Sequence, residues 1–276
     1  MALEQKTSTR RKFLLGSLGL LAGGLGVGWL NRRRLADSLI RIVNGHNPNL
    51  RVTAAPDGGD TACVVTSRQV EGPFYFPSPE RRDVTEGRKG RPLDLRLQLT
   101  RHPDCTPLAN AAVEIWHCDA EGIYSGYPEE ISHDAWNTLV FFVRNAEKRA
   151  DGEIHVPPRT EATFLRGLQR TDVDGWVEFR TIFPGWYTGR IPHVHVRAVT
   201  AEGEQVTTQF YFEQVLHDRL YTTTAPYDRF GKCPTTLETD GVLTRAGDWV
   251  EGVLLNVAWS DHGPLAAVAR MGVERA

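Results

Sequence analysis

The stretch GWYTGRIPHVHV, residues 185–196, holds a tyrosine, an arginine and two histidines that are separated by a single residue. In a β-strand alternate residues share a face, so His193 and His195 lie on one side and Val194 and Val196 on the other. The valine face can enter a core, while the two histidine backbones stand about 7 Å apart by strand rise and can approach one ion. A half-buried strand with hydrogen-bonded histidines is the plain alternative, and the pair alone does not decide between them.

The chain around this stretch is rich in short segments with strand character. LDLRLQL alternates leucine with polar residues at period two, and other segments rich in valine, aromatic residues or threonine are bounded by glycine, proline and aspartate. We expect an all-β fold, an antiparallel sandwich or barrel-like core with long loops and few short helices. The segments are 93–99, 111–116, 175–180, 193–199, 205–212 and 252–259, with a helix expected around 135–150.

The composition excludes some classes of protein. The chain has 276 residues, 41% of them hydrophobic and 24% charged, with a net charge of −2, which is ordinary for a globular protein. We expect no nucleic-acid partner, because no basic stripe stands out beyond the N-terminus.

The N-terminus is typical of a targeting segment. Arg10 and Arg11 precede Phe13 and Leu14, and an uncharged run with six glycines continues to Leu30. This pattern resembles the twin-arginine export signal and predicts export across the cytoplasmic membrane by that machinery, to the periplasm or the extracellular space. A plain transmembrane anchor formed by residues 13–30 is the alternative, and retention of the segment as an anchor stays open.

We expect three parts along the chain: residues 1–35 as signal or anchor, residues 36–62 as linker, and residues 63–276 as the folded domain that carries the function. Export makes disulfides feasible, and four cysteines allow three complete pairings that the sequence does not distinguish. These are Cys63, Cys105, Cys118 and Cys233.

Two tyrosines near the histidine pair bear on the choice of metal. Tyr187 lies six residues before His193, and Tyr124 follows a predicted strand. A phenol ligates a metal only when the cation is acidic enough to remove its proton, and phenolate with imidazole suits ferric iron better than zinc or magnesium. Most tyrosines are core or rim residues, however, and spacing alone does not select Tyr124 from the seven in the chain.

Four segments in order resemble the intradiol ring-cleavage dioxygenases, the non-haem ferric enzymes that open catechols between their two hydroxyls. EGPFY at 71–75 resembles the entry motif of that family. VEIWHCDA at 113–120, continuing to YSGY at 124–127, resembles its first ligand segment. FLRG with TDVDG, at 164–175, and TIFPGWYTGRIPHVH, at 181–195, resemble the next two, and TTQFYF at 207–212 matches the following strand.

The resemblance implies a site and a reaction. It implies Fe(III) held by Tyr124, Tyr187, His193 and His195, with Tyr187 the ligand that leaves when a catechol binds. It implies that Arg190 stabilises negative charge on the substrate and that Gln209 hydrogen-bonds near the reacting centre. The expected reaction uses O2 to open the ring to a cis,cis-muconate-type dicarboxylic acid.

Several points stay open at this stage. The catechol-cleaving branch carries a helical dimerisation segment where this chain has signal and linker, so the mode of any homo-oligomer is not implied. The segment 128–163 either covers the substrate mouth or forms a surface excursion with its own small apolar cluster. Glu114, His117 and Asp119 are expected to have structural or orienting roles.

Three alternative hypotheses for the whole protein remain. It could be a zinc or copper enzyme that uses the His-x-His pair, an exported non-catalytic β-sandwich that binds aromatics or sugars, or a structural domain.

Overall fold

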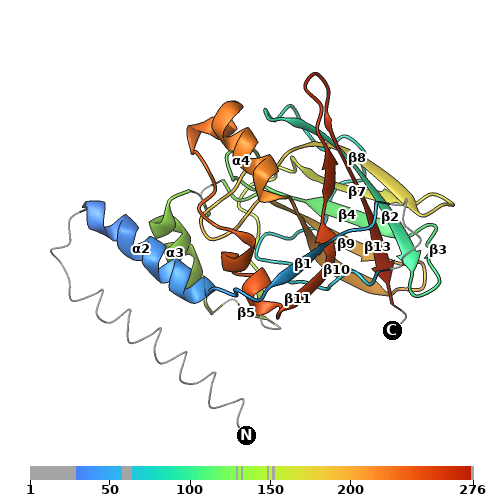
Figure 1. Cartoon of the computed structure of the whole chain (residues 1–276), viewed down its shortest axis with the longest axis horizontal. Helices are drawn as coiled ribbons and strands as arrows, with labels where there is room; N and C mark the ends of the chain where they lie inside the picture. The colour runs from blue at the N-terminus through green and yellow to red at the C-terminus, as the bar shows by residue number, and fades with distance from the viewer. Residues whose placement is uncertain are drawn as a thin grey trace, which may run out of the picture.

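The computed structural model describes residues 29–57, 64–128, 130–131, 133–147, 149–150 and 153–274. Its strands form two large β-sheets joined by long loops, with helices grouped at one side (Figure 1). The first sheet has the order β1-β11-β10-β9-β4-β7. Its strands are β1 Arg51–Ala54, β4 Ala112–Trp116, β7 Arg166–Arg170, β9 His193–Val199, β10 Gln205–Tyr211 and β11 Trp249–Leu254.

The second sheet has the order β12-β13-β2-β3, and β8 also pairs with β2, along residues 92–98. Its strands are β2 Pro92–Arg101, β3 Thr106–Pro107, β8 Trp176–Ile182, β12 Asn256–Ala258 and β13 Leu265–Val273. The expectation of an all-β fold is confirmed, and most strand pairs are antiparallel, but the two sheets are mixed. β13 pairs with β2 in parallel, and β1 does so with β11, because the segments near the chain ends return beside strands that are distant in sequence. A two-stranded pair, β5 Arg149–Ala150 and β6 Glu153–Ile154, stands apart.

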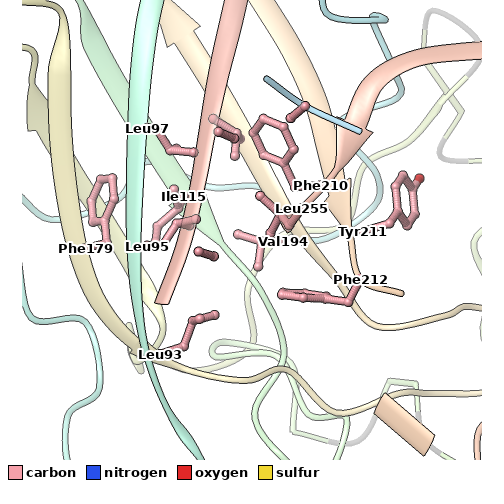
Figure 2. Close-up of a cluster of buried hydrophobic side chains, with 14 of the residues drawn as sticks. Leu93, Leu95, Leu97, Ile115, Phe179, Val194, Phe210, Tyr211, Phe212 and Leu255 are labelled. Atoms are coloured by element: carbon pink, nitrogen blue, oxygen red, sulfur yellow. The ribbon is translucent and has the colours of Figure 1, made fainter. Parts of the chain in front are cut away.

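The core lies between the two sheets. The alternating leucines of β2 point into it and are fully buried, together with Val194 of β9 (Figure 2). Phe179 of β8 and Phe210 of β10 add aromatic surface from either side. The period-two pattern of β2 therefore supplies one wall of the core and the valine face of β9 part of the other.

The N-terminal part of the fold differs from the sequence expectation. The helix expected near residues 31–45 is present as α2, Trp29–Asn44, but residues 36–62 were expected to be linker outside the fold, and β1 follows the helix. Ala36 and Ile40 of α2 are buried against Ala135 of helix α3, and β1 pairs with β11. Over residues 36–57 the stretch therefore belongs to the folded body, because its small and apolar side chains have a partner helix and its backbone has a partner strand.

Residues 1–28 lie outside the described residues, so the predicted twin-arginine signal and most of the alternative anchor are not described. Within the described ranges, no helix combines the length and apolar character that crossing a membrane requires. Cys63 also lies outside the described residues. Cys118 and Cys233 are free thiols, and both are buried.

The segment 128–163 contains α3, Ala135–Arg144, near the predicted helix. One side of α3 packs on α2, through Trp136 and Leu139. Phe141 instead joins an apolar cluster with Phe74 and Tyr124, which borders the site described below. The segment is thus attached to the site region, and its action as a cover for substrate remains a prediction. Among the described residues, the other helices are α4, Gln214–Thr223, and three short 3₁₀ turns at 227–229, 237–239 and 243–245.

Truncation of the core wall should destabilise the protein without altering its architecture. Leu97 is fully buried in β2, so Leu97→Ala should lower the free energy of unfolding by about 2–5 kcal/mol through lost burial and a residual cavity. Val173→Ala is the control, because Val173 is 83% exposed and should change stability by less than about 0.5 kcal/mol. Urea unfolding measures both. Equal stability of the two variants would contradict the assignment of β2 to the core.

Candidate metal centre

The central strand β9 carries the two histidines, and its register fixes their neighbours. His195 stands opposite Trp116 of β4 on one side and Gln209 of β10 on the other. Val194 and Val196 of β9 are fully buried on the core face. The histidines lie on the other face, where they are also buried, at 1% and 3% exposure. Both faces of β9 are therefore enclosed, one by the core and one by the candidate site.

The four predicted metal ligands converge at this face. The Tyr124 hydroxyl oxygen lies 3.1 Å from His193 Nε2 and 3.2 Å from His195 Nε2. The Tyr187 hydroxyl oxygen lies 3.3 Å from His193 Nε2. Tyr124 and Tyr187 come from separate turns, each closed by a short bridge, Tyr124 to Tyr127 and Tyr187 to Arg190. Residues more than sixty positions apart thus present four donor atoms to one point.

The imidazoles are held by their other atoms. His193 Nδ1 donates to the Ile191 carbonyl at 2.7 Å, which leaves Nε2 with its lone pair toward the phenols. The His195 ring stacks on Trp116 at 4.8 Å between centroids and 9° between planes. A Cβ at Gly72 would lie 3.3 Å from His195 Cε1, and Gly72 has φ +83°, so glycine suits this close approach. The EGPFY segment therefore lies directly against a predicted ligand.

Burial and charge set the protonation of the donors. Burial, reinforced by the Arg190 charge, lowers the pKa of His193 and of His195 well below the usual value. Burial raises the pKa of Tyr187 to about 12 and that of Tyr124 well above its usual range. Before a cation binds, the set is therefore two neutral imidazoles and two neutral phenols.

This donor set fits a hard, strongly acidic metal ion. Two donors that each bind one metal at about 2.0–2.1 Å lie roughly 3 Å apart, which matches the oxygen-to-nitrogen spacings here. Within the described ranges no three His, Cys, Asp or Glu side chains gather as a metal site, so a metal at this point depends on the phenols. Phenol oxygens suit ferric iron better than zinc, whose usual ligands are thiolate, imidazole and carboxylate.

Arg190 lies beside the donors and is held by a residue that the sequence interpretation missed. Its Nε donates to both oxygens of Asp240, at 3.1 and 2.9 Å, and Asp240 is fully buried. Asp240 also accepts from the backbone N–H groups of Ile191 and Val242, at 3.0 and 2.9 Å. Burial alone would lower the pKa of Arg190, but the Asp240 carboxylate reverses this and raises it, so the guanidinium stays charged. No motif in the sequence marks Asp240, which is fifty residues away.

Gln209 completes this network. Its Oε1 accepts from Arg190 Nη2 at 2.5 Å, and its Nε2 donates to the Val70 carbonyl at 2.9 Å. The Tyr211 hydroxyl lies 3.5 Å from Arg190 Nη2 and donates to Gln69 at 2.5 Å. The structure thus places Gln209 beside Arg190, with its amide bound to protein groups at both ends.

The loop that carries Tyr124 is fixed by the residues expected to orient it. Asp119 Oδ1 accepts from the backbone N–H groups of Glu121 and Ile123, at 2.9 and 3.0 Å. The fully buried His117 bonds the Cys118 carbonyl and the Thr181 hydroxyl, both at 2.7 Å. Neither Asp119 nor His117 reaches the donors, which agrees with structural roles for both.

A buried arginine that the sequence interpretation did not single out supports the same loop. Arg166 is fully buried, and its Nε donates to Ser125 Oγ at 2.7 Å. Its Nη2 donates to the Phe74 carbonyl at 2.7 Å, so one guanidinium joins the EGPFY segment to the residue after Tyr124. The guanidinium also lies 3.8 Å from the centroid of the Phe76 ring. The FLRG motif, whose third residue is Arg166, is the sequence feature that could have identified it.

Comparison with known proteins places this geometry in context. The family model described as Dioxygenase matches residues 70–225, more than half of the chain. Catechol 1,2-dioxygenase 1 of Acinetobacter lwoffii is 24% identical over 215 residues, which cover 68% of this chain and 60% of that protein. Catechol 1,2-dioxygenase 2 of the same organism is 28% identical over 178 residues, covering 63% and 47%. The chain therefore spans only 47–60% of the length of these curated relatives.

Solved structures give the same grouping. The intradiol ring-cleavage dioxygenase of Tetranychus urticae is 26% identical with a TM-score of 0.63, covering 77% of this chain and 95% of that one. The 3-chlorocatechol 1,2-dioxygenase of Rhodococcus opacus is 15% identical with a TM-score of 0.50 and covers 99% of both chains, a likeness of fold alone.

Ferric ion binding should become tighter as pH rises. The phenols of Tyr124 and Tyr187 are protonated near neutral pH, so binding that uses both must release both protons. Competition with a chelator between about pH 6 and about pH 8, together with direct measurement of proton release, tests this. Tyr124→Phe should release about one proton fewer than the wild type. Tyr221→Phe is the control, since that buried hydroxyl donates to the Pro184 carbonyl. Unchanged proton release in Tyr124→Phe would exclude the phenol as a ligand.

Proposed function

Because this chain belongs to the intradiol ring-cleavage dioxygenase family, we propose that it cleaves a catechol-type ring between its two hydroxyls with O2. The product would be a cis,cis-muconate-type dicarboxylic acid. We also propose non-haem ferric iron as the cofactor, held by Tyr124, Tyr187, His193 and His195. When bound, the iron would act as a Lewis acid and a template for the two catechol oxygens.

The observation that carries this proposal is the convergence of two phenols and two imidazoles in a buried site. The three contacts, at 3.1, 3.2 and 3.3 Å, join four donors from three separate segments. Structural tyrosines and histidines usually satisfy their polar atoms with backbone or water partners. Here the phenol oxygens lie within hydrogen-bond distance of imidazole nitrogens instead of backbone groups, and a cation bound between them would replace these hydrogen bonds.

The two tyrosines differ in a way that suits different roles. The Tyr124 oxygen contacts both imidazoles, whereas the Tyr187 oxygen contacts one imidazole, that of His193, and the Tyr124 hydroxyl. Tyr187 is therefore the more peripheral donor and the better candidate to leave when substrate binds. Since burial raises the pKa of Tyr187 to about 12, its released phenolate would take up a proton from the catechol hydroxyl.

Arg190 would supply fixed positive charge beside the substrate. Its Nε is bound to Asp240 and its Nη2 to Gln209, so the guanidinium is oriented before substrate arrives. A preorganised cation in a buried site stabilises developing negative charge without reorganisation. Asp240 would thus be a positioning residue that holds the Nε side of the Arg190 guanidinium, and Gln209 would hold its Nη2 side.

Export across the cytoplasmic membrane remains part of the proposal. The paired arginines and the apolar, glycine-rich run that follows support a twin-arginine signal, with a membrane anchor formed by residues 13–30 as the alternative. The export machinery would then be a transient partner.

Oxygen uptake by the iron-loaded protein against a panel of catechols tests the proposed function. We expect O2 consumption coupled to ring opening between the hydroxyls, identified by mass spectrometry of the product, and loss of both in Tyr124→Phe. Tight binding of a catechol without O2 consumption would instead support a non-catalytic aromatic-binding protein. Ring opening outside the two hydroxyls would refute intradiol cleavage.

Replacement of Arg190 by lysine should lower the rate while the protein stays folded. Lysine keeps a cation near Asp240 but lacks the planar fork that also reaches Gln209. We expect Arg190→Lys to lower kcat at least about tenfold, which is less than the roughly 100- to 1,000-fold loss on removal of a whole donor because lysine keeps the positive charge. Arg170→Lys is the control, because Arg170 is exposed. Equal steady-state kinetics for the two variants would remove Arg190 from the mechanism.

A further inference from the structure

The carboxyl end of α2 lies against the turn that carries Tyr187 and Arg190, and we propose that Asn44 is a positioning residue for both. The proposal rests on the proposed function for its catalytic readout, whereas its structural readout does not depend on that function. It gives a role to a helix in a region that the sequence suggested to be signal and linker.

One side-chain amide joins the two loops that hold Arg190. Asn44 Nδ2 donates to the Gly189 carbonyl at 2.8 Å and to the Thr239 carbonyl at 3.3 Å. Gly189 directly precedes Arg190, and Thr239 directly precedes Asp240. The amide therefore bridges the backbone on both sides of the buried ion pair between Arg190 and Asp240.

The identity of this side chain is constrained. Both neighbours of Nδ2 are carbonyl oxygens, so the amide must present its N–H₂ group to them. Two glycines allow the approach. A Cβ at Gly241 would lie 2.4 Å from Asn44 Oδ1, and one at Gly189 would lie 3.0 Å from Ile40 Cγ2. A longer side chain at position 44 would meet the same crowding.

The helix itself is firmly attached, so Asn44 can transmit its position. Ala36 and Ile40 are buried against α3. At the carboxyl end, the Thr244 hydroxyl donates to the Asn44 carbonyl at 2.5 Å, and the backbone N–H of Asn47 donates to the Glu238 carbonyl at 2.9 Å. Asn44 is thus the point at which a packed helix holds the loop 238–244 against the turn 187–190.

The turn needs such support. Arg190 N–H donates to the Tyr187 carbonyl at 3.1 Å, so the two functional residues close one short turn, and Gly189 within it has φ +86°. Glycine at this position has wide conformational freedom, and the bond from Asn44 to its carbonyl limits that freedom. Since a displacement of about 1 Å at a reacting centre can lower the rate about 100-fold, loss of the bond should be felt at both residues.

Three variants of the full chain test the proposal. Asn44→Ala removes the amide, and Asn44→Asp keeps its shape but sets a carboxylate oxygen against two carbonyl oxygens. Asn47→Ala is the matched control, because the half-buried Asn47 side chain bonds Asn49, Gly247 and Asp248 instead of Gly189 and Thr239. With iron-loaded protein and a catechol that the wild type cleaves, we expect kcat about tenfold lower in both Asn44 variants. The kcat of Asn47→Ala should stay within about twofold of the wild-type value, because this side chain does not contact the turn 187–190.

Hydrogen exchange supplies a readout that needs no activity. Backbone amides in peptides that cover 185–192 and 237–243 should exchange faster in both Asn44 variants than in Asn47→Ala. Wild-type kcat and unchanged exchange in Asn44→Ala and Asn44→Asp would overturn the proposal. If the wild type opens no catechol, the proposed function fails, and exchange alone then decides whether Asn44 holds the turn.

Discussion

The enclosure of β9 on both faces is the constraint on which the rest of the structure depends. Val194 and Val196 fill the core between the sheets, while His193 and His195 face the phenols. A slip of one residue would place imidazoles in the apolar core and valines against Tyr124. The packing that stabilises the fold and the alignment that gathers the donors are therefore a single requirement.

The burial of the site also sets the protonation states of its side chains. Burial keeps the imidazoles neutral and the phenols protonated, so the site invites a cation that can displace protons. The charge of Arg190 persists in the same environment because Asp240 balances it. A buried charge without such a partner would cost several kcal/mol, so the loop that brings Asp240 is as necessary to the site as the strand that brings the histidines.

The sequence predicted those parts of the molecule that are encoded by patterns over a few neighbouring residues. Period-two alternation in LDLRLQL and HVHVRAV marks strands with one core face, and the motifs marked Tyr124, Tyr187, His193 and His195 as one set. Parallel pairing of β2 with β13 was missed, because strand direction depends on partners about 170 residues apart. Asp240 and Asn44 were missed for a similar reason. Each acts through contacts with distant backbone or charge, and neither belongs to a pattern along the chain.

Because contacts between residues distant in sequence could not be predicted, the predicted domain boundary at the N-terminal helix α2 was wrong. A basic segment before an Asn-, Pro- and Gly-rich stretch is typical of a region outside the fold. Over residues 31–44 its buried side chains are Ala36 and Ile40, too few to stand out in the sequence, and its helix partner α3 lies about 100 residues later. The contacts of Asn44 with Gly189 and Thr239 are what connect this helix to the chemistry.

The central claim is that two phenols and two imidazoles hold one ferric ion. Metal analysis of the purified protein, combined with its visible absorption spectrum, tests this most directly. The account predicts about one ferric ion per chain and a phenolate-to-iron charge-transfer band that changes or disappears in Tyr124→Phe and persists in Tyr221→Phe. A colourless protein that carries zinc, or a band unaffected by Tyr124→Phe, would contradict it.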